Sequence, residues 1–107
     1  MINQEFVHTV VNFFNRGDWS PTQGEYFDYE EKKCCATGAY ALSKGFQQSE
    51  KAFQGYATIC EFLNLPVHFI YGVVRGFDDC QHNEHEPRTQ EFLDGRETGE
   101  HLRSILL

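Results

Sequence analysis

Small side chains recur at helical spacing between Cys34 and Phe46, and they limit the folds that are open to this chain. One stripe of the predicted helix holds Cys34, Gly38, Ala41 and Gly45, and the neighbouring stripe holds Cys35, Ala39, Leu42 and Phe46. Two adjoining apolar stripes are too wide for a surface helix, and small side chains let other helices approach closely. We therefore expect a central helix that begins near Cys35, ends by Gly45 and is packed on more than one side.

Apolar periodicity predicts helices on both sides of this central one. The first follows Asn3, a suitable N-cap, and Gly17 ends it. Its buried face is expected to hold Phe6, Val7, Val10, Val11, Phe13 and Phe14. The next helix is capped by Ser49 and ends by Pro66. Its apolar side holds Ala52, Phe53, Tyr56, Ala57, Ile59, Cys60 and Leu63.

Two more segments towards the C-terminus have helical patterns. Residues 67–76 place Val67, Ile70, Tyr71 and Val74 on one face. The same segment is rich in strand formers, and Gly72 weakens a helix by about 1 kcal/mol relative to Ala, so helix and strand are both open here. The capping-box spacing of Asp94 and Glu97 predicts the start of a last helix, with Leu102, Ile105 and Leu106 on its buried face.

Length and composition suit one domain, residues 1–107, with an ordinary hydrophobic core. The chain has 107 residues, of which 40% are hydrophobic and 15% aromatic. The predicted fold is mainly α, a compact bundle of four to five short helices with an acidic, loop-rich end. The apolar run after Glu5 is broken by His8, Thr9 and Asn12, so we expect no secretory signal, and the four Cys residues then indicate reduced thiols in a cytoplasm.

The segment from Asp18 to Lys33 lacks helical periodicity and predicts an ordered, aromatic loop. Large aromatic side chains are usually buried, which favours a lid over the core. Rings that lie exposed beside carboxylates are instead typical of a binding face, and on that interpretation Trp19, Tyr26 and Tyr29 contact a partner protein.

The net charge of −7 is concentrated towards the C-terminus, where eight acidic and three basic residues occur from Asp78 onward. Nucleic acid and anionic membranes both demand surplus Lys and Arg, so we expect neither as a partner. A protein with a basic surface is the natural complement. The acidic residues expected to contact it are Asp78, Asp79, Glu84, Glu86, Glu91 and Asp94, with Arg88 as the only opposite charge nearby.

The same acidic segment holds the best set of metal ligands, Cys80, His82 and His85. Thiolate and imidazole suit zinc, but the spacing is not specific and no Cys-x-x-Cys pair occurs, which favours a solvated polar loop. Cys34 or Cys35 at a helix N-terminus is a candidate nucleophile, although burial would silence either thiol. The glycines match neither a phosphate-binding loop nor a dinucleotide fingerprint.

Three short motifs resemble a loose group of uncharacterised proteins from bacteriophages and bacteria. They are the Trp19-Ser20-Pro21 loop, the helix start from Cys35 to Ala39, and the turn from Gly76 to Asp78. The resemblance covers about Trp19 to Ile105. It implies a helical fold and a phage or prophage setting, and it implies no activity for any residue.

Together these patterns predict a binding protein and not an enzyme. In its most concrete form, the chain is a phage-type accessory protein in the host cytoplasm that blocks a host protein, such as a defence nuclease complex, by covering a basic surface. The alternative is a metal-binding or small-molecule-binding protein, with or without hydrolytic activity, that uses Cys80, His82 and His85.

Overall fold

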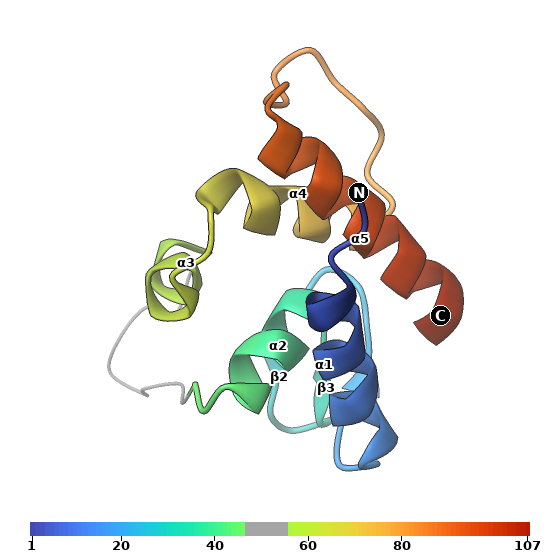
Figure 1. The fold of residues 1–107 in the computed structure, drawn as a ribbon. Coiled ribbons are helices and arrows are strands. Elements are labelled where there is room, and N and C mark those ends of the chain that lie inside the picture. The colour runs from blue at the N-terminus through green and yellow to red at the C-terminus, as the bar shows by residue number, and fades with distance from the viewer. Residues whose placement is uncertain (47–55) are drawn as a thin grey trace.

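The computed structural model describes residues 1–46 and 56–107, and this part of the chain is mainly α, as predicted (Figure 1). In chain order the elements are α1 (Gln4–Asn15), β1 (Ser20–Pro21), β2 (Phe27–Asp28), β3 (Lys33–Cys34), α2 (Ala36–Ser43), α3 (Tyr56–Leu63), α4 (Val67–Phe77) and α5 (Gln90–Leu106). The radius of gyration is 12.9 Å, close to the roughly 13 Å of a compact domain of about 100 residues. None of the described helices combines the length and the apolar character that a membrane crossing requires.

Local capping signals place the ends of α1 and α2 where the sequence predicted them. The Asn3 side chain accepts a hydrogen bond from the Phe6 N–H at 3.0 Å. The Cys35 sulfur accepts one from the Gly38 N–H at 3.4 Å. Gly45 has φ +95° and follows the last turn of α2 as a Schellman-type cap, in which the Phe46 N–H donates to the Ala41 carbonyl at 3.0 Å. These bonds occupy backbone groups that the helix itself leaves unpaired.

Helix α2 lies at the centre of the core, which confirms its predicted burial on more than one side. Every residue from Ala36 to Ala41 is buried. On one side Tyr40 stacks on Phe6 of α1, with ring centroids 4.3 Å apart. Phe6 also meets Phe69 of α4 edge to face at 5.5 Å, so one ring joins three helices.

The aromatic segment before α2 forms a small sheet, and the predicted loop is wrong on this point. Strand β3 lies between the other two, parallel to β1 and antiparallel to β2. Each strand is two residues long, so no alternating pattern marks it in the sequence. The backbone just before β2 also explains why position 38 is a glycine. A Cβ at Gly38 would overlap the Tyr26 carbonyl oxygen. The expected neighbour of Gly38 was a helix, and the observed one is this non-helical backbone.

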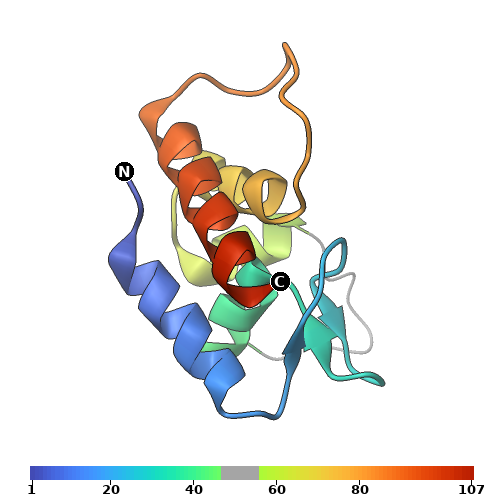
Figure 2. The same cartoon turned by 90° about the vertical axis from the view of Figure 1, so that its right-hand side faces the viewer.

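The closest helix pair is α4 with α5, which lie side by side in two perpendicular views (Figures 1 and 2). A Cβ on Gly72 or Gly76 would overlap a carbonyl oxygen of α5, and a Cβ on Gly95 or Gly99 would overlap one of α4. Each helix therefore contributes a Gly-x-x-x-Gly pair, which brings the two backbones into direct contact.

Several helix boundaries in the structure differ from the predicted ones. Residues 67–77 are helical, which decides between the helix and the strand that the sequence left open, and Pro66 is the N-cap of α4. Helix α5 begins at Gln90 because Thr89 caps it, accepting from the Phe92 N–H at 3.3 Å. The predicted start at Asp94 is therefore wrong, and Asp94 lies inside the helix. The predicted cap Ser49, with Ala52 and Phe53, lies outside the described residues.

Candidate functional site

One apolar side of α4 is only partly covered by the other described helices. The sequence predicted Val67, Ile70, Tyr71 and Val74 on one face; Ile70 is buried, but Val67 is 54% exposed and Tyr71 and Val74 are half-buried. The buried residues of α4 are Phe69, Ile70, Gly72, Val73, Gly76 and Phe77. Contact between the glycines and α5 sets this rotation of α4. The stripe of Val67, Tyr71 and Val74 is consequently left at the surface.

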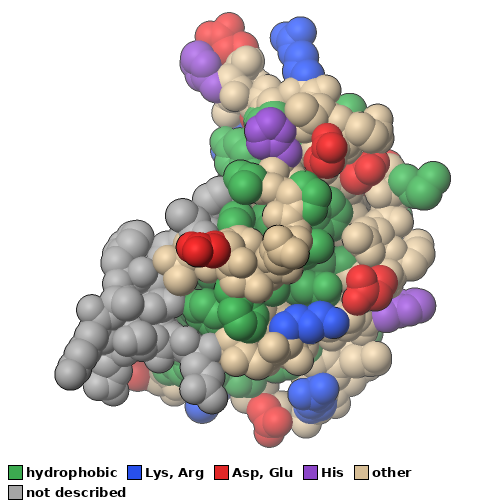
Figure 3. Space-filling model, turned by 60° about the vertical axis from the view of Figure 1, so that its left-hand side comes forward, with side chains coloured by type: hydrophobic (Ala, Val, Ile, Leu, Met, Phe, Trp, Pro, Cys, Tyr) green, Lys and Arg blue, Asp and Glu red, His purple; other side chains and the backbone are tan. Residues whose placement is uncertain are grey.

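This stripe forms the floor of a groove of about 490 Å³. The residues that line the groove are Tyr26, Val67, His68, Tyr71, Val74, His85 and Pro87. Hydrophobic side chains also gather more widely on the side of the molecule that carries α3 and α4 (Figure 3). His68 is held in place because its Nδ1 lies 3.0 Å from the Thr89 hydroxyl. The Tyr71 ring packs on Phe92 with centroids 5.6 Å apart, so the floor of the groove rests on α5.

A smaller cavity of about 80 Å³ shares Tyr26 and Val74 with the groove. We call it the acidic cavity, because its remaining lining residues are Gly24, Glu25, Cys35 and Asp78. Among the described residues, neither Glu25 nor Asp78 takes part in an ion pair. The two spaces therefore adjoin at Tyr26 and Val74, and the smaller one is lined by the acidic residues Glu25 and Asp78.

Backbone contacts hold the acidic cavity in shape. The Gly24 N–H donates to the Asp78 carboxylate at 3.1 Å, and the Gln23 side chain donates to the Phe77 carbonyl at 2.8 Å. The Cys35 N–H donates to the Glu25 carbonyl at 3.0 Å. Burial raises the pKa of the Asp78 carboxyl, and the Gly24 hydrogen bond only partly opposes this rise. A cation in this cavity would remove that penalty.

Most of the acidic residues predicted to contact a partner already have partners within the chain. Asp79 lies 3.2 Å from an Arg103 nitrogen, and Asp94 forms an ion pair with the Met1 amino group at 2.5 Å. Exposed Glu84 lies 3.7 Å from the His85 ring. Glu91 is exposed and, in the described part of the chain, forms no ion pair. These acids therefore do not form one continuous uncompensated surface.

Glu86 lies inside the molecule, and its carboxylate faces other residues of the chain instead of a partner. Its side chain is 5% exposed and bonds to Arg75, to Arg96 at 3.2 Å and to His82 at 3.1 Å. Burial alone favours the protonated carboxyl. The hydrogen bond and charge of Arg75, with the charge of Arg96, outweigh burial and hold the pKa of Glu86 below its usual range.

The same two arginines fix the loop between α4 and α5. Arg75 donates to the Gln81 carbonyl at 2.6 Å, and Arg96 donates to the Cys80 carbonyl. The expectation that Arg88 is the only opposite charge near the acidic segment is therefore wrong. Arg75, near the end of α4, and Arg96, within α5, both direct their side chains to this loop.

The structure does not assemble the predicted metal ligands. His82 bonds to Glu86, while His85 is exposed and lies beside Glu84. Cys80 is half-buried. In the described part of the chain, no three residues among His, Cys, Asp and Glu converge in a way that could hold a metal ion.

Cys34 and Cys35 are both buried, and burial raises the pKa of each thiol, that of Cys35 to about 12. Such thiols stay protonated at neutral pH and are weak nucleophiles. This environment argues against the catalytic thiol considered from the sequence.

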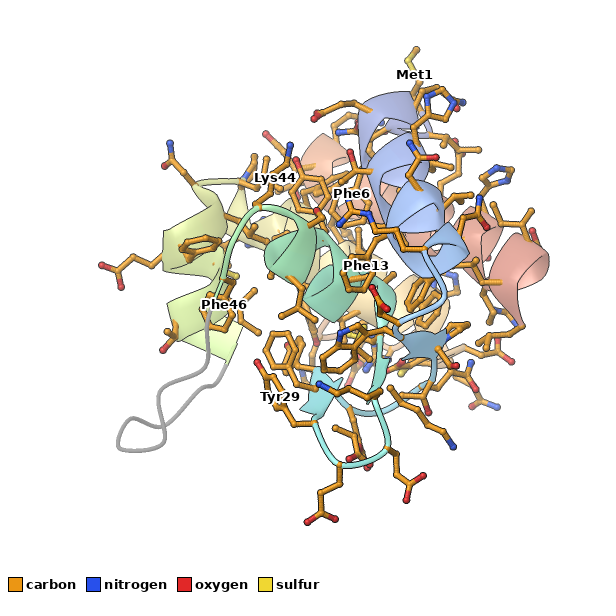
Figure 4. All side chains as sticks on the ribbon, turned by 90° about the horizontal axis from the view of Figure 1, so that it is seen from below. Met1, Phe6, Phe13, Tyr29, Lys44 and Phe46 are labelled. Carbon is orange, nitrogen blue, oxygen red and sulfur yellow. The ribbon has the colours of Figure 1, made fainter. Side chains whose placement is uncertain are left out.

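The predicted aromatic contacts are divided between core and surface. Trp19 and Tyr26 pack against the core, as a lid would, whereas Tyr29 is 39% exposed. A row of rings runs across this face, with consecutive centroids 5.1 to 6.5 Å apart, and Figure 4 labels three of its members. The row comprises Phe13, Trp19, Tyr29, Phe27, Phe46 and Phe62. Most of these rings cover one another, and Tyr29 and Phe62 are the two members that are exposed.

Sequence reasoning missed the groove as a site, although one signal for it was present. Helix α4 has apolar residues on more of its circumference than one neighbouring helix can cover, so the sequence indicated a second apolar surface on this helix. Comparison of the chain with protein-family models, with curated proteins and with solved structures found no match. The functional argument therefore rests on the groove itself.

Proposed function

We propose that this protein acts by binding another protein, and that it holds a segment of that partner in the groove with a basic side chain in the acidic cavity. The single observation that carries the proposal is that the two spaces adjoin. An apolar groove of about 490 Å³ shares Tyr26 and Val74 with a cavity lined by Glu25 and Asp78, and neither acidic residue has an ion-pair partner among the described residues. Concave apolar sites with a few placed polar groups are where proteins bind ligands.

The net charge of −7 supports the same assignment, because it favours approach of a basic partner. The predicted contact set changes in this proposal. Asp78 and Tyr26 remain in it, and Glu25 joins them. Glu86 leaves it because its carboxylate is bound inside the fold. The narrower role, blocking a host defence nuclease as a phage-type protein would, is supported only by the resemblance of short motifs.

Affinity capture from host lysate with a groove variant tests this proposal. Val67→Arg places a cation at the floor of the groove, where it repels a basic segment and fills apolar space. The matched control is Ile105→Arg, because Ile105 is 51% exposed and lies near the C-terminal end of α5, outside the groove. We expect wild type and Ile105→Arg to retain one specific protein that Val67→Arg loses, with recovery falling as salt rises. Equal recovery by both variants would overturn the proposal, provided that circular dichroism shows both to be folded.

A further inference from the structure

We propose, building on the function proposed above, that the groove binds an extended, proline-containing segment whose Lys or Arg side chain enters the acidic cavity. The lining favours this occupant because five of its seven residues have cyclic side chains. Tyr26, Tyr71, His68, His85 and Pro87 supply the rings. Polyproline II segments have no internal hydrogen bonds, keep a solvated backbone and dock into aromatic-lined grooves through their rings.

The dimensions agree with a short segment. Val67 and Val74 are seven positions apart on α4, which corresponds to about 10 Å along the helix axis. Three residues in the polyproline II conformation span about 9 Å. The cavity of about 80 Å³ at the Val74 end admits the end of a side chain but no backbone.

Strand addition does not suit this site. The strands of the sheet are two residues long, and Tyr26, which precedes β2, has its carbonyl packed against Gly38 of α2. The groove therefore presents no strand edge with a row of unpaired backbone groups, which strand addition requires. A helical segment is the other alternative, because a helix carries its own backbone hydrogen bonds. Replacing the prolines of a peptide by alanines would favour the helical conformation of that peptide.

Charge complementarity selects the basic side chain. Glu25 and Asp78 lie on the same small cavity, and Asp78 is half-buried with a backbone N–H as its hydrogen-bond donor. A guanidinium or ammonium group entering there forms a charge-assisted hydrogen bond with the Asp78 carboxylate, which has no ion-pair partner among the described residues. Because burial raises the pKa of Asp78, a bound cation should lower it, and affinity should fall as the pH is lowered through that pKa.

Three synthetic peptides test the inference against the full-length protein. The parent probe is acetyl-Pro-Pro-Leu-Pro-Arg-Pro-amide. One comparison peptide replaces every Pro by Ala, and the other replaces Arg by Gln. Calorimetry measures affinity, and amide and methyl NMR shifts locate the site. We expect the parent to shift the resonances of Val67, Val74 and Asp78, and each comparison peptide to bind about tenfold more weakly or worse.

A protein variant isolates the acidic cavity. Asp78→Asn keeps the oxygen that accepts the Gly24 hydrogen bond but removes the charge, so the preference for Arg over Gln should shrink by about tenfold. Glu30→Gln is the matched control, because Glu30 is exposed and does not line the groove or the acidic cavity. It should leave the preference unchanged.

The outcomes separate this inference from the proposed function. Equal binding of the alanine peptide overturns the extended, proline-containing segment and points to a helical one. Equal binding of the Arg and Gln peptides overturns the acidic cavity as the cation site. If no peptide binds while Val67→Arg still abolishes capture from lysate, the inference fails and the proposed function stands. If capture is also insensitive to Val67→Arg, both fail.

Discussion

Helices α4 and α5 meet through glycines on both sides of their contact, whereas α2 uses Gly38 to receive the backbone of Tyr26, which is not helical. Small residues at helical spacing occur in both regions. In the first region the backbones of two rigid helices are in direct contact, so neither helix can shift without moving the other. In the second, the neighbour is a short strand-and-turn segment that can shift more easily. Small residues thus predict close approach, but they do not say what approaches.

The two regions also differ in charge. At one end of the α4 and α5 pair, Glu86 joins Arg75 to Arg96. The buried residues of α2 itself carry no charge, and next to them lie the buried thiols of Cys34 and Cys35. Lowering the pH should therefore destabilise the contact between α4 and α5. The reactivity of the thiols should show how easily the region around α2 opens.

The strongest test of this comparison enlarges a glycine between the helices. Gly95→Leu forces side-chain atoms into the position of the Phe69 carbonyl, so α4 and α5 must separate. We expect a loss of about 3 kcal/mol or more in the free energy of unfolding, measured by urea titration. Glu97→Leu, at an exposed position of the same helix, should cost little. A Gly95 variant as stable as the Glu97 variant would mean that the two backbones are not in contact.

Removing the charge of Glu86 should have the next largest effect. Glu86→Gln leaves two arginines facing a neutral amide, and we expect a loss of about 2–3 kcal/mol at neutral pH. Because the pKa of Glu86 is lowered in the folded protein, its contribution is present above the unfolded pKa of about 4.3 and is lost as the pH falls through the folded value. The stability difference between wild type and variant should therefore shrink in acid. A constant difference from neutral pH to acid would exclude the ionised carboxylate as its cause.

Enlarging Gly38 should cost less than enlarging Gly95. Gly38→Leu displaces the Tyr26 carbonyl, but the chain there can move outward, so we expect a loss of about 1–2 kcal/mol in the free energy of unfolding. Because Tyr26 lines both the groove and the acidic cavity, the variant should also bind the proline peptide more weakly. Urea titration and calorimetry on the same sample check both effects. A loss equal to that of Gly95→Leu would show that the segment at Tyr26 is as rigid as a helix.

Thiol labelling is expected to show the smallest effect, because no residue is substituted in this experiment. Cys34, Cys35 and Cys60 are buried, and Cys80 is half-buried on the loop between α4 and α5. A thiol-reactive dye should label Cys80 first in the native protein and the other three only after denaturation. Peptide mapping after brief labelling identifies the site. Rapid labelling of Cys35 would mean that the region around α2 opens more easily than the packing suggests.

Local chemistry made much of the fold predictable. The ends of α1 and α2 depend on residues close to them in the sequence. These are Asn3 as the N-cap of α1, Cys35 as the N-cap of α2, and Gly45 after the last turn of α2. The start of α5 was missed because Thr89 and Asp94 both suit a cap, and the helix uses the earlier one. The sheet was missed because its register joins Ser20 to Lys33, and strands of two residues leave no periodic trace.

The candidate site was less predictable, because its residues come from separate parts of the chain. Tyr26 and Asp78 were predicted as contacts, but nothing in the sequence placed Glu25 beside Asp78 on one cavity. Glu86 was assigned to the surface because its pairing with Arg75 and Arg96 depends on how α4 and α5 pack. An acidic residue can be assigned to an open acidic surface only when the basic residues that pair with it in the fold are known.

The sequence by itself determined that the chain is mainly helical, where α1 and α2 begin and end, and that α2 is buried, because caps and apolar periodicity act within a few residues. Only the tertiary structure decided which side of α4 faces the core. Apolar side chains cover most of α4, so hydrophobicity alone does not select a face. Gly72 and Gly76 do so by direct contact with α5, and that rotation leaves Val67, Tyr71 and Val74 as the floor of the groove.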